Sequence, residues 1–328
     1  MRRRDFIALL SGAAFVLPFT ATSQPPTVPV IGFLSGRSLR DSAGDLRAFR
    51  QGLADTGYSE GHNVAIDFAW ADDNQIERLR PLAANLLRHQ VAVIAAVGGN
   101  NSTLAAKEAT ATIPIVFTSG SDPTKVGLVE SLNHPGGNVT GVSWFSAELG
   151  AKRLELLHEL LPNVSLFGLL LNPSSPESKE QPTDAMQAAS ALGCQLLIVN
   201  ASTDDEIPSA FATLVERRVG GILVGPDPFF ITRRARLVTL AKRHALPAIF
   251  SFREDAEAGG LMSYGNSITD AYHQAGVYVG RILKGEKPGD LPVMRAAKFE
   301  FVINNSSAKA LSLTIPQSIL LRADEIID

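Results

Sequence analysis

The sequence of 328 residues contains one cysteine, Cys194, and six histidines. A single thiol cannot form an intramolecular disulfide, and zinc or iron–sulfur sites built on cysteine need several thiolates. The histidines are scattered along the chain without the spacing of metal ligands. Cys194 lies in the apolar run 193–199, where we expect it to pack in the core. The sequence therefore predicts no metal site and no cofactor.

The chain also lacks the short motifs of common catalytic and nucleotide-binding sites. It contains no G-x-S-x-G, H-E-x-x-H, G-x-G-x-x-G or Walker A sequence. A catalytic triad can assemble from distant positions, so these absences do not exclude an enzyme. No pattern in the sequence designates a catalytic residue, and we do not expect an enzyme.

The apolar run 6–19 at the N-terminus is too short for a comfortable membrane span. A basic segment precedes it and small residues follow it, which is typical of a signal peptide. Arg3 and Arg4 also fit a twin-arginine export signal, which serves proteins exported in folded form. We expect residues 1–23 to be a signal peptide cleaved near Ser23, leaving a periplasmic protein. An uncleaved membrane anchor is the alternative.

The charge of the chain is small and slightly acidic. Lysine and arginine number 30 against 33 acidic residues, for a formal net charge of −3. Cleavage after Ser23 would remove three arginines and one aspartate, which makes the product more acidic. Such a chain carries no basic footprint for nucleic acid. Its length and its 45% hydrophobic content suit a soluble protein of about two domains.

The segment 91–123 organises the rest of the chain. Two β-branched apolar runs, 91–97 and 113–117, flank an alanine-rich segment at 103–111, which predicts a β-α-β unit with parallel strands. Both runs end in small polar loops at the same carboxyl edge, where open α/β sheets bind ligands. Ordinary strand–helix turns, with Asn101 or Ser102 as the helix N-cap, are the alternative for either loop.

The same alternation of strands and helices continues on both sides of this segment. The first half predicts strands at 30–35, 63–70 and 139–144, helices at 45–56 and 75–89, and a short helical turn at 127–132. The second half predicts strands at 166–171, 194–200, 219–224 and 247–250, and helices at 147–161, 184–192, 203–216 and 233–244. The end of the chain predicts strands at 260–265 and 299–303, and helices at 271–283, 306–311 and 317–323. We interpret these last elements as returns of the chain to each half. The expected fold class is therefore α/β, with the same unit of parallel sheet and flanking helices built twice.

Polar and aromatic residues follow the predicted strands of both halves. Hydroxyls and free N–H groups at helix starts suit an anion such as a carboxylate, and aromatic rings supply an apolar wall. Asp122 or Asp227 would take a ligand ammonium or hydroxyl. A helix N-cap role for Asp227, and core packing for each aromatic residue, are the alternatives. The candidate ligand-binding residues are Ser35, Gly36, Gly98, Gly99, Asn100, Ser119, Gly120, Ser121, Asp122, Asn172, Asp227, Phe229, Phe252 and Tyr264.

A series of segments in a fixed order extends over essentially the full chain. The segments are RRRDFIALLSGAA, VIGFLS, TIPIVFTSGSDPTKVGLVESLNHPGGNVTGVS, AKRLELLHELLP, GGLMSYG, LPV and KFEFVINNSSAKALSLTIPQSILLRADEII. Together they resemble the ABC-transporter substrate-binding proteins of the family that includes tryptophan/tyrosine-type uptake binding proteins. The chain departs from that family at 120–124, where a plainer GDPV-like loop is typical, and this departure bears on what the loop holds.

This resemblance implies a periplasmic binding protein type I fold, with two Rossmann-like lobes whose parallel sheets are flanked by helices and a three-stranded hinge between the lobes. It implies capture of a small solute by hinge closure and delivery to an ABC permease in the inner membrane. We assign 28–143 and 257–287 to the first lobe, and 144–256 and 288–328 to the second. The first-lobe loops would hold a carboxylate, the second-lobe loops would close over the other end, and Tyr264 would lie near a crossing. We expect a monomer that binds an amino-acid-like or aromatic-acid-like ligand.

Three other classes compete with this interpretation. An exported sensing receptor would lack a neighbouring permease and ATPase gene. An exported α/β enzyme would turn its ligand over rather than retain it. A cytosolic sugar-repressor relative is disfavoured by the export signal, and by the absence of a DNA-binding segment ahead of the first strand.

Overall fold

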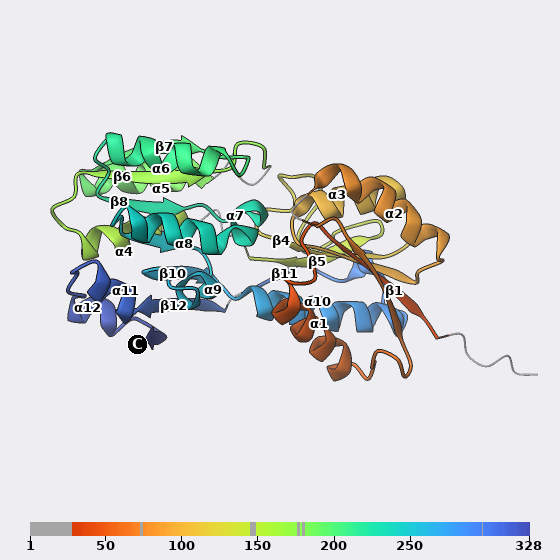
Figure 1. Ribbon diagram of the computed structural model, residues 1–328. Coiled ribbons are helices and arrows are strands. Elements are labelled where there is room, and N and C mark those ends of the chain that lie inside the picture. The colour runs from red at the N-terminus through yellow and green to blue at the C-terminus, as the bar shows by residue number, and fades with distance from the viewer. Residues whose placement is uncertain (1–27, 73–74, 145–148, 176–177, 179–180, 297) are drawn as a thin grey trace, which may run out of the picture.

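The computed structural model describes residues 28–72, 75–144, 149–175, 178, 181–296 and 298–328. The expected signal peptide, residues 1–23, lies outside this part of the chain. The described residues form two α/β lobes that lie side by side (Figure 1). None of the helices in these ranges has both the length and the apolar character needed to cross a membrane.

The first lobe is built on a sheet of six parallel strands. These strands are β1 (Val30–Ser35), β2 (Ala65–Trp70), β3 (Val93–Val97), β4 (Ile115–Ser119), β5 (Val139–Ser143) and β11 (Met294–Arg295). Their order across the sheet is β11-β5-β4-β3-β1-β2. The helical elements of this lobe are α1 (Ala43–Asp55), η1 (Ile76–Arg78), α2 (Leu79–Arg88), α3 (Asn100–Ala109), α10 (Ile268–Leu283) and η4 (Pro288–Asp290).

The second lobe is built on a sheet of seven strands. These strands are β6 (Leu166–Leu171), β7 (Gln195–Asn200), β8 (Gly221–Val224), β9 (Ala248–Phe250), β10 (Met262–Asn266), β12 (Phe299–Asn304) and β13 (Glu325–Ile327). Their order is β13-β12-β10-β9-β8-β6-β7, and only the β10–β12 pair is antiparallel among them. The helices are α4 (Gly150–Leu160), α5 (Gln181–Leu192), α6 (Glu206–Glu216), α7 (Pro228–Thr232), α8 (Arg234–Arg243), α9 (Arg253–Glu257), α11 (Asn305–Ala310) and α12 (Gln317–Leu320).

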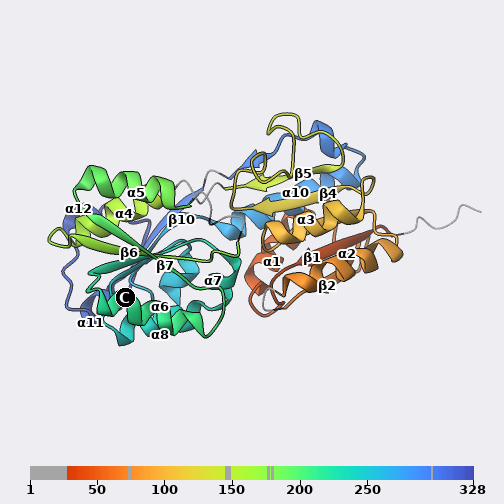
Figure 2. The same ribbon diagram turned by 90° about the horizontal axis from the view of Figure 1, so that it is seen from above.

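Each sheet is covered by helices on both faces. In the first lobe α2 and α3 cover one face while α1 and α10 cover the other (Figure 1), and in the second lobe α4 and α5 lie opposite α6 and α8 (Figure 2). Successive strand residues therefore enter different cores: Phe33 packs toward α1 and α10, whereas Leu34 packs toward α2 and α3. Because both faces are buried, the strands are continuous apolar runs rather than alternating ones.

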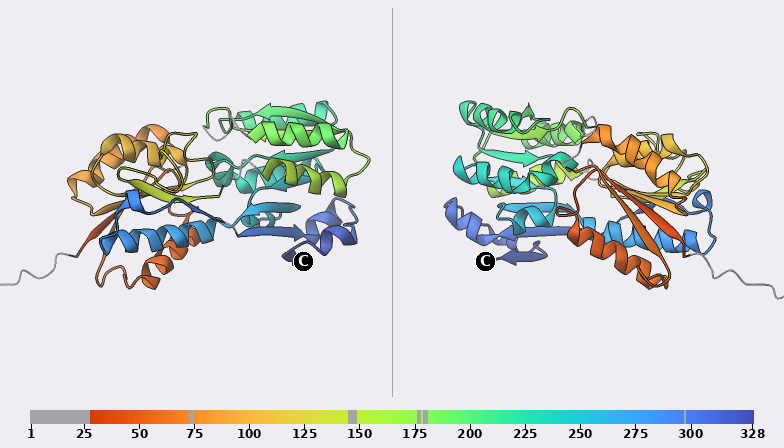
Figure 3. Two further views of the ribbon diagram at one scale, coloured as in Figure 1. Left: turned by 180° about the vertical axis from the view of Figure 1, so that it is seen from behind. Right: turned by 45° about the vertical axis from the view of Figure 1, so that its right-hand side comes forward.

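Helix α10 packs unusually close to α1, although more than 200 residues of chain separate them. A Cβ atom on Gly52 of α1 would lie 1.9 Å from the backbone oxygen of His273, and one on Gly276 of α10 would lie 2.1 Å from the backbone oxygen of Phe49. Glycine at both positions allows this approach because it has no side chain to separate the backbones. The views in Figure 3 show the two helices side by side. This contact holds α10 in the first lobe, with its N-terminal end toward the second lobe.

The chain passes between the two sheets three times, after β5, after β10 and after β11. For two segments, the lobe expected from the sequence differs from the lobe whose sheet the segment joins. Strand β10 pairs with β9 and β12 in the second sheet, and β11 pairs with β5 in the first. Hydrogen bonding between strands, rather than their order in the chain, decides which sheet each one joins. We therefore propose 28–143 with 268–295 as the first lobe, and 150–266 with 299–328 as the second.

One local expectation was wrong, and so was one alternative interpretation. The segment 127–132 contains no helix; hydrogen-bonded turns cover 122–128, where the N–H of Leu128 donates to the backbone oxygen of Pro123. Helix α3 begins at Asn100, with Gly99 as its N-cap residue rather than Asn101 or Ser102. The positive φ of Gly99, +121°, lets the chain turn directly from the loop after β3 into the helix.

Candidate ligand-binding site

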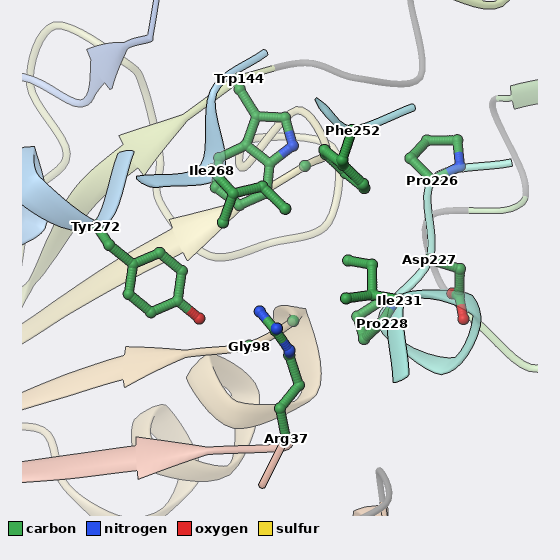
Figure 4. A pocket seen from close by; sticks show the side chains of 12 residues that line it. Arg37, Gly98, Trp144, Pro226, Asp227, Pro228, Ile231, Phe252, Ile268 and Tyr272 are labelled. Atoms are coloured by element: carbon green, nitrogen blue, oxygen red, sulfur yellow. The ribbon is translucent and has the colours of Figure 1, made fainter. Parts of the chain in front are cut away.

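A cleft of about 440 Å³, partly open to solvent, lies between the two lobes (Figure 4). Its first-lobe wall comes from loops after β1, β3, β4 and β5, and from the start of α10. Its second-lobe wall comes from the loops after β8 and β9 and from α7. The lining residues are Arg37, Gly98, Gly99, Gly120, Trp144, Pro226, Asp227, Pro228, Ile231, Phe252, Ile268 and Tyr272. The cleft thus lies at the carboxyl edges of the strands, as the sequence predicted.

The polar side chains expected from the first lobe form a buried network with one another. The hydroxyl of Ser119 donates to Oδ1 of Asn100 at 2.7 Å, and the amide of Asn100 donates to the hydroxyl of Ser121 at 3.1 Å. The hydroxyl of Ser143 donates to the backbone oxygen of Ser121 at 2.8 Å. None of these four residues is among those that line the cleft. The network holds the loops after β3 and β4 in place.

The glycines in these loops bring the backbone to the cleft. Gly98, Gly99 and Gly120 line it, whereas Gly36 is buried behind it. A Cβ on Gly98, whose φ is +75°, would lie 2.7 Å from the hydroxyl oxygen of Ser35. That hydroxyl accepts a hydrogen bond from the N–H of Arg37 at 3.1 Å. Ser35 therefore shapes the loop after β1. The side chain of Arg37, two residues later, lines the cleft.

Arg37 is the basic side chain in the cleft lining, and the sequence prediction omitted it. Its side chain is buried, and Nη1 donates to Oδ2 of Asp45 at 2.8 Å. Nη2 donates to the backbone oxygen of Asp41. Burial acts to lower the pKa of Arg37, but the charge of Asp45 and its hydrogen bond outweigh it, so the pKa is raised. Arg37 is therefore a fixed cation at the wall of the cleft.

Tyr272 was also missed, because it lies on α10, far from the loops in sequence. Its ring is fully buried, and its hydroxyl points toward the guanidinium of Arg37 (Figure 4). Burial raises the pKa of the Tyr272 phenol, and the nearby Arg37 cation opposes that rise. Tyr272 is thus a neutral phenol at physiological pH. The hydrophobic spacing of α10 marked it as a core residue, and no local signal in the sequence marks it as part of a cleft.

In the second lobe, the expected polar pair lies at the start of α7. Oδ1 of Asp227 accepts hydrogen bonds from the backbone N–H of Phe229 at 2.9 Å and from the amide of Asn172 at 3.0 Å. Asp227 is therefore the N-cap of α7, which was the alternative role, although it also lines the cleft. Oδ1 of Asn172 accepts the N–H of Ser174 at 3.1 Å. Asn172 lines a smaller hollow between the lobes, together with Asn100 and Asp227.

The three expected aromatic residues have different surroundings. Phe252 lines the cleft. Phe229 is 5% exposed in the core between β8 and α8, with the Arg233 guanidinium 4.4 Å from its ring centre. Tyr264 stacks on Phe299 at a centroid distance of 6.3 Å, outside the cleft lining. Trp144, Ile231 and Ile268 provide apolar wall that the sequence prediction omitted.

Asp122 also lies outside the cleft lining. Its Oδ1 accepts hydrogen bonds from the N–H of Thr124 at 2.9 Å and from the hydroxyl of Thr124 at 2.6 Å, which stabilises the turn after β4. Burial acts to raise the pKa of Asp122, but these hydrogen bonds outweigh it and lower the pKa. Asp122 is an ionised turn residue.

The arrangement is suited to holding a small molecule with an apolar body and a hydrogen-bonding end. Within the described ranges, no group of three or more His, Cys, Asp or Glu side chains is placed to hold a metal ion. Apolar walls from two lobes, with a few polar groups between them, are typical of small-molecule sites.

Comparison with known proteins gives three close similarities. The chain is 30% identical to a tyrosine-binding protein of Clostridioides difficile (strain R20291) over 268 residues, which cover 81% of this chain and 76% of that protein. It is 28% identical to an ABC domain solved in complex with L-Trp from Streptococcus pneumonia, with a TM-score of 0.81 over 90% of this chain and 100% of that one. It is 26% identical to a ligand-free, open substrate-binding protein with adhesive properties from Clostridium difficile, with a TM-score of 0.67 over 92% and 99% of the two chains.

The fold is shared more widely. A periplasmic binding protein/LacI transcriptional regulator structure from Alkaliphilus metalliredigens is 13% identical, with a TM-score of 0.57 over 84% of this chain and 97% of that one. That likeness identifies the periplasmic binding protein type I fold. The family model described as ABC transporter substrate binding protein matches residues 27–327. The chain therefore belongs to the ABC transporter substrate-binding protein family, whose members bind solutes outside the cytoplasm.

Proposed function

We propose that this protein captures a small solute that has a carboxylate and an apolar body, and delivers it to an ABC permease in the inner membrane. The observation that carries this proposal is the cleft between the lobes. Arg37 places a cation on one side of it, and Trp144, Ile231 and Phe252 place apolar surface around the rest. The amino-acid ligands named for the two relatives make an amino-acid-like or aromatic-acid-like solute the leading class.

Capture proceeds by closure of the two lobes about the three passages between the sheets. Such closure is a shift toward a state in which the ligand contacts both walls, and it requires tighter binding to the closed form. The chain resembles the L-Trp complex (TM-score 0.81) more than the ligand-free, open structure (TM-score 0.67), which supports a nearly closed arrangement here. Gly99 and Pro228, one from each lobe, already meet across the cleft. The protein acts as a periplasmic monomer after cleavage near Ser23.

The residues proposed to contact the solute come from both lobes. Gly98, Gly99 and Gly120 present backbone from the first lobe, and Asp227 and Phe252 present side chains from the second. The other expected residues support them. The groups that hold these loops in place are Ser35, Gly36, Asn100, Ser119, Ser121, Asp122, Asn172, Phe229 and Tyr264.

The test is native mass spectrometry of the exported protein, followed by denaturation and identification of any released molecule. A solute that binds only the folded state raises its stability by RT ln(1 + [L]/Kd), so the released molecule should also raise the melting temperature. Ile231→Arg places a charged side chain in the cleft and should abolish that rise. The matched control is Leu321→Arg, at a position that is 76% exposed, which should preserve it.

Two results would refute the proposal. One is that neither a carried molecule nor any solute in a screen of amino acids and aromatic acids shifts the melting temperature. The other is that the bound molecule is converted to a product, which would favour an exported enzyme.

A further inference from the structure

Buried hydrogen-bond donors without acceptors gather around the first-lobe side of the cleft. Nε of Arg37, the hydroxyl of Tyr272 and the hydroxyl of Thr118 make no hydrogen bond of normal geometry in the described part of the chain, although Tyr272 lies near enough to Arg37 and Thr118 for both to lower its pKa. These residues are 3%, 1% and 0% exposed. Buried polar groups are normally paired. Donors left unpaired beside a cleft therefore indicate the place of a ligand acceptor.

The chemistry of these donors specifies which kind of ligand group they can bind. A guanidinium N–H can only donate, and the two hydroxyls can donate to an acceptor placed between them and Arg37. In Figure 4 the Tyr272 hydroxyl and the Arg37 guanidinium face each other inside the cleft. The indole N–H of Trp144, on the same lobe, is a further buried donor without a partner in the described residues. A carboxylate, which only accepts and carries a negative charge, matches this donor set.

The described lining of the cleft offers an ammonium group one carboxylate, that of Asp227. Arg37 and Asp227 are the charged side chains in its described lining. Asp227 is used as the N-cap of α7, where its Oδ1 receives two hydrogen bonds. In Figure 4 its carboxylate lies beyond Pro228 and Ile231 as seen from Arg37. An α-ammonium group, one carbon from the carboxylate held at Arg37, would face apolar wall there, where a charge without a partner is costly.

The walls specify the body of the ligand. Trp144, Ile231, Phe252 and Ile268 surround the space next to the donors. The empty space between these walls, about 440 Å³, includes open solvent at the mouth of the cleft. Apolar walls of this kind suit a ring or a branched chain, and they offer no acceptors for the hydroxyls of a sugar.

We infer that the solute is a hydrophobic carboxylate without an α-ammonium group, such as an arylpropanoate, whose carboxylate is bound by Arg37 and Tyr272. This inference rests on the proposed function and narrows its ligand class. It assigns binding roles to Arg37 and Tyr272, and it separates this protein from relatives that bind amino acids.

The test uses matched compounds that differ only at one end. Isothermal titration calorimetry at pH 7 compares 3-phenylpropanoate with L-phenylalanine, indole-3-propanoate with L-tryptophan, and 3-phenylpropanoate with its neutral amide. We expect at least one acid to bind at least tenfold more tightly than its amino acid, and the amide to bind more weakly than the acid. Equal or tighter binding of the amino acids, or no binding of any acid, would overturn the inference.

Two tyrosine variants of α10 test where the ligand carboxylate binds. Tyr272→Phe removes only a hydroxyl and keeps the buried ring, so the protein should fold normally. Loss of a hydrogen bond to a charged group should weaken binding of the acid by about tenfold or more. The control is Tyr278→Phe, on the same helix, whose hydroxyl donates to the backbone oxygen of Pro292 at 2.7 Å, outside the cleft lining. Equal affinities for wild type and Tyr272→Phe would overturn the assignment.

Failure of this inference is distinguishable from failure of the proposed function. If native mass spectrometry finds a retained amino acid and the acids do not bind, the binding function is supported and the ligand class inferred here is wrong. If no solute is retained and no compound binds, both fail.

Discussion

Gly99 in the first lobe and Pro228 in the second meet across the cleft, and a Cβ on Gly99 would lie 2.9 Å from Cγ of Pro228. Real Cβ atoms essentially never approach another heavy atom this closely, so a side chain at position 99 must displace one lobe or its loop. The φ of Gly99, +121°, also disfavours any other residue. The closeness of the two lobes therefore depends on the absence of one side chain.

Replacing Gly99 by alanine is expected to open the lobes. The added methyl group would collide with Pro228, so the closed state loses stability relative to the open one. Small-angle X-ray scattering with a saturating ligand should show a larger radius of gyration than for wild type, and calorimetry should show weaker binding. The control is Gly57→Ala, where φ is +89° but no atom lies within 4 Å of the new Cβ. Scattering curves that coincide for wild type and Gly99→Ala would contradict the closed arrangement.

Replacing Gly52 by alanine is expected to destabilise the first lobe. The new Cβ would lie 1.9 Å from the backbone oxygen of His273, so α1 and α10 must separate. Overpacking typically costs about 1–3 kcal/mol, and a backbone neighbour that cannot move aside favours the upper end of that range. Urea unfolding followed by circular dichroism measures the loss.

Gly44 provides a control for this substitution on the same helix. The nearest atom to a Cβ at that position is Nη2 of Arg47, at 3.9 Å. Gly44→Ala should leave stability unchanged or raise it by up to about 1 kcal/mol through helix propensity. If both alanine variants change the free energy of unfolding by the same amount, the close contact between α1 and α10 is not the cause.

Glu254 is expected to make stability depend on pH. Burial raises the pKa of this carboxyl from 4.5 to about 7, and the nearby charges of Asp45 and Asp255 add to the rise, whereas Arg234 opposes it. Between about pH 4.5 and 7 the folded state therefore holds a proton that the unfolded state has lost. The free energy of unfolding should fall as the pH rises through this window, and the Glu254 contribution should be constant above it.

The variant Glu254→Gln should remove this dependence. The pKa difference corresponds to at most about 3 kcal/mol over the window. Urea unfolding at pH 5, 6, 7 and 8 measures it as the difference between wild type and variant. Glu257→Gln, at an exposed glutamate of α9, serves as the control. Indistinguishable pH profiles for the two variants would exclude Glu254 as the source.

Export is expected to depend on the N-terminal arginines. The intact mass of the periplasmic protein should correspond to a chain that lacks about residues 1–23. Replacing both Arg3 and Arg4 by lysine should retain the protein in the cytoplasm. Replacing Arg2 alone by lysine is the control. A periplasmic product of full length would favour the membrane anchor instead of cleavage.

Much of the secondary structure was predictable because its signals are local. The apolar runs at 30–35, 166–171 and 219–224 specify buried strands, and the structure confirms strands there at β1, β6 and β8. The α/β class and the convergence of loops at the carboxyl edges follow from the alternation of strands and helices. The short strands β11 and β13 were not predicted, since two or three residues carry no periodicity.

The site was predictable only where it is made of such loops. Gly98, Gly99 and Gly120 were located correctly at the edge of the cleft, because small residues after a strand are a local signal. Whether a polar side chain in these loops faces the cleft or a neighbour was not predictable. Ser119 and Asn100 instead form a hydrogen bond with each other, and this bond depends on the register of β3 and β4.

Local patterns in the sequence thus specify the strands, the helices and the edge where the cleft lies, since each depends on neighbours in the chain. The packing of α10 against α1 sets the chemistry of the cleft, because it places Tyr272 beside Arg37 from 235 positions along the chain. Gly52 and Gly276 allow that packing. Strand β10 lies in the second sheet and β11 in the first, so the chain returns to the first lobe between them. Such contacts depend on the shapes of both lobes together, so no local pattern records them.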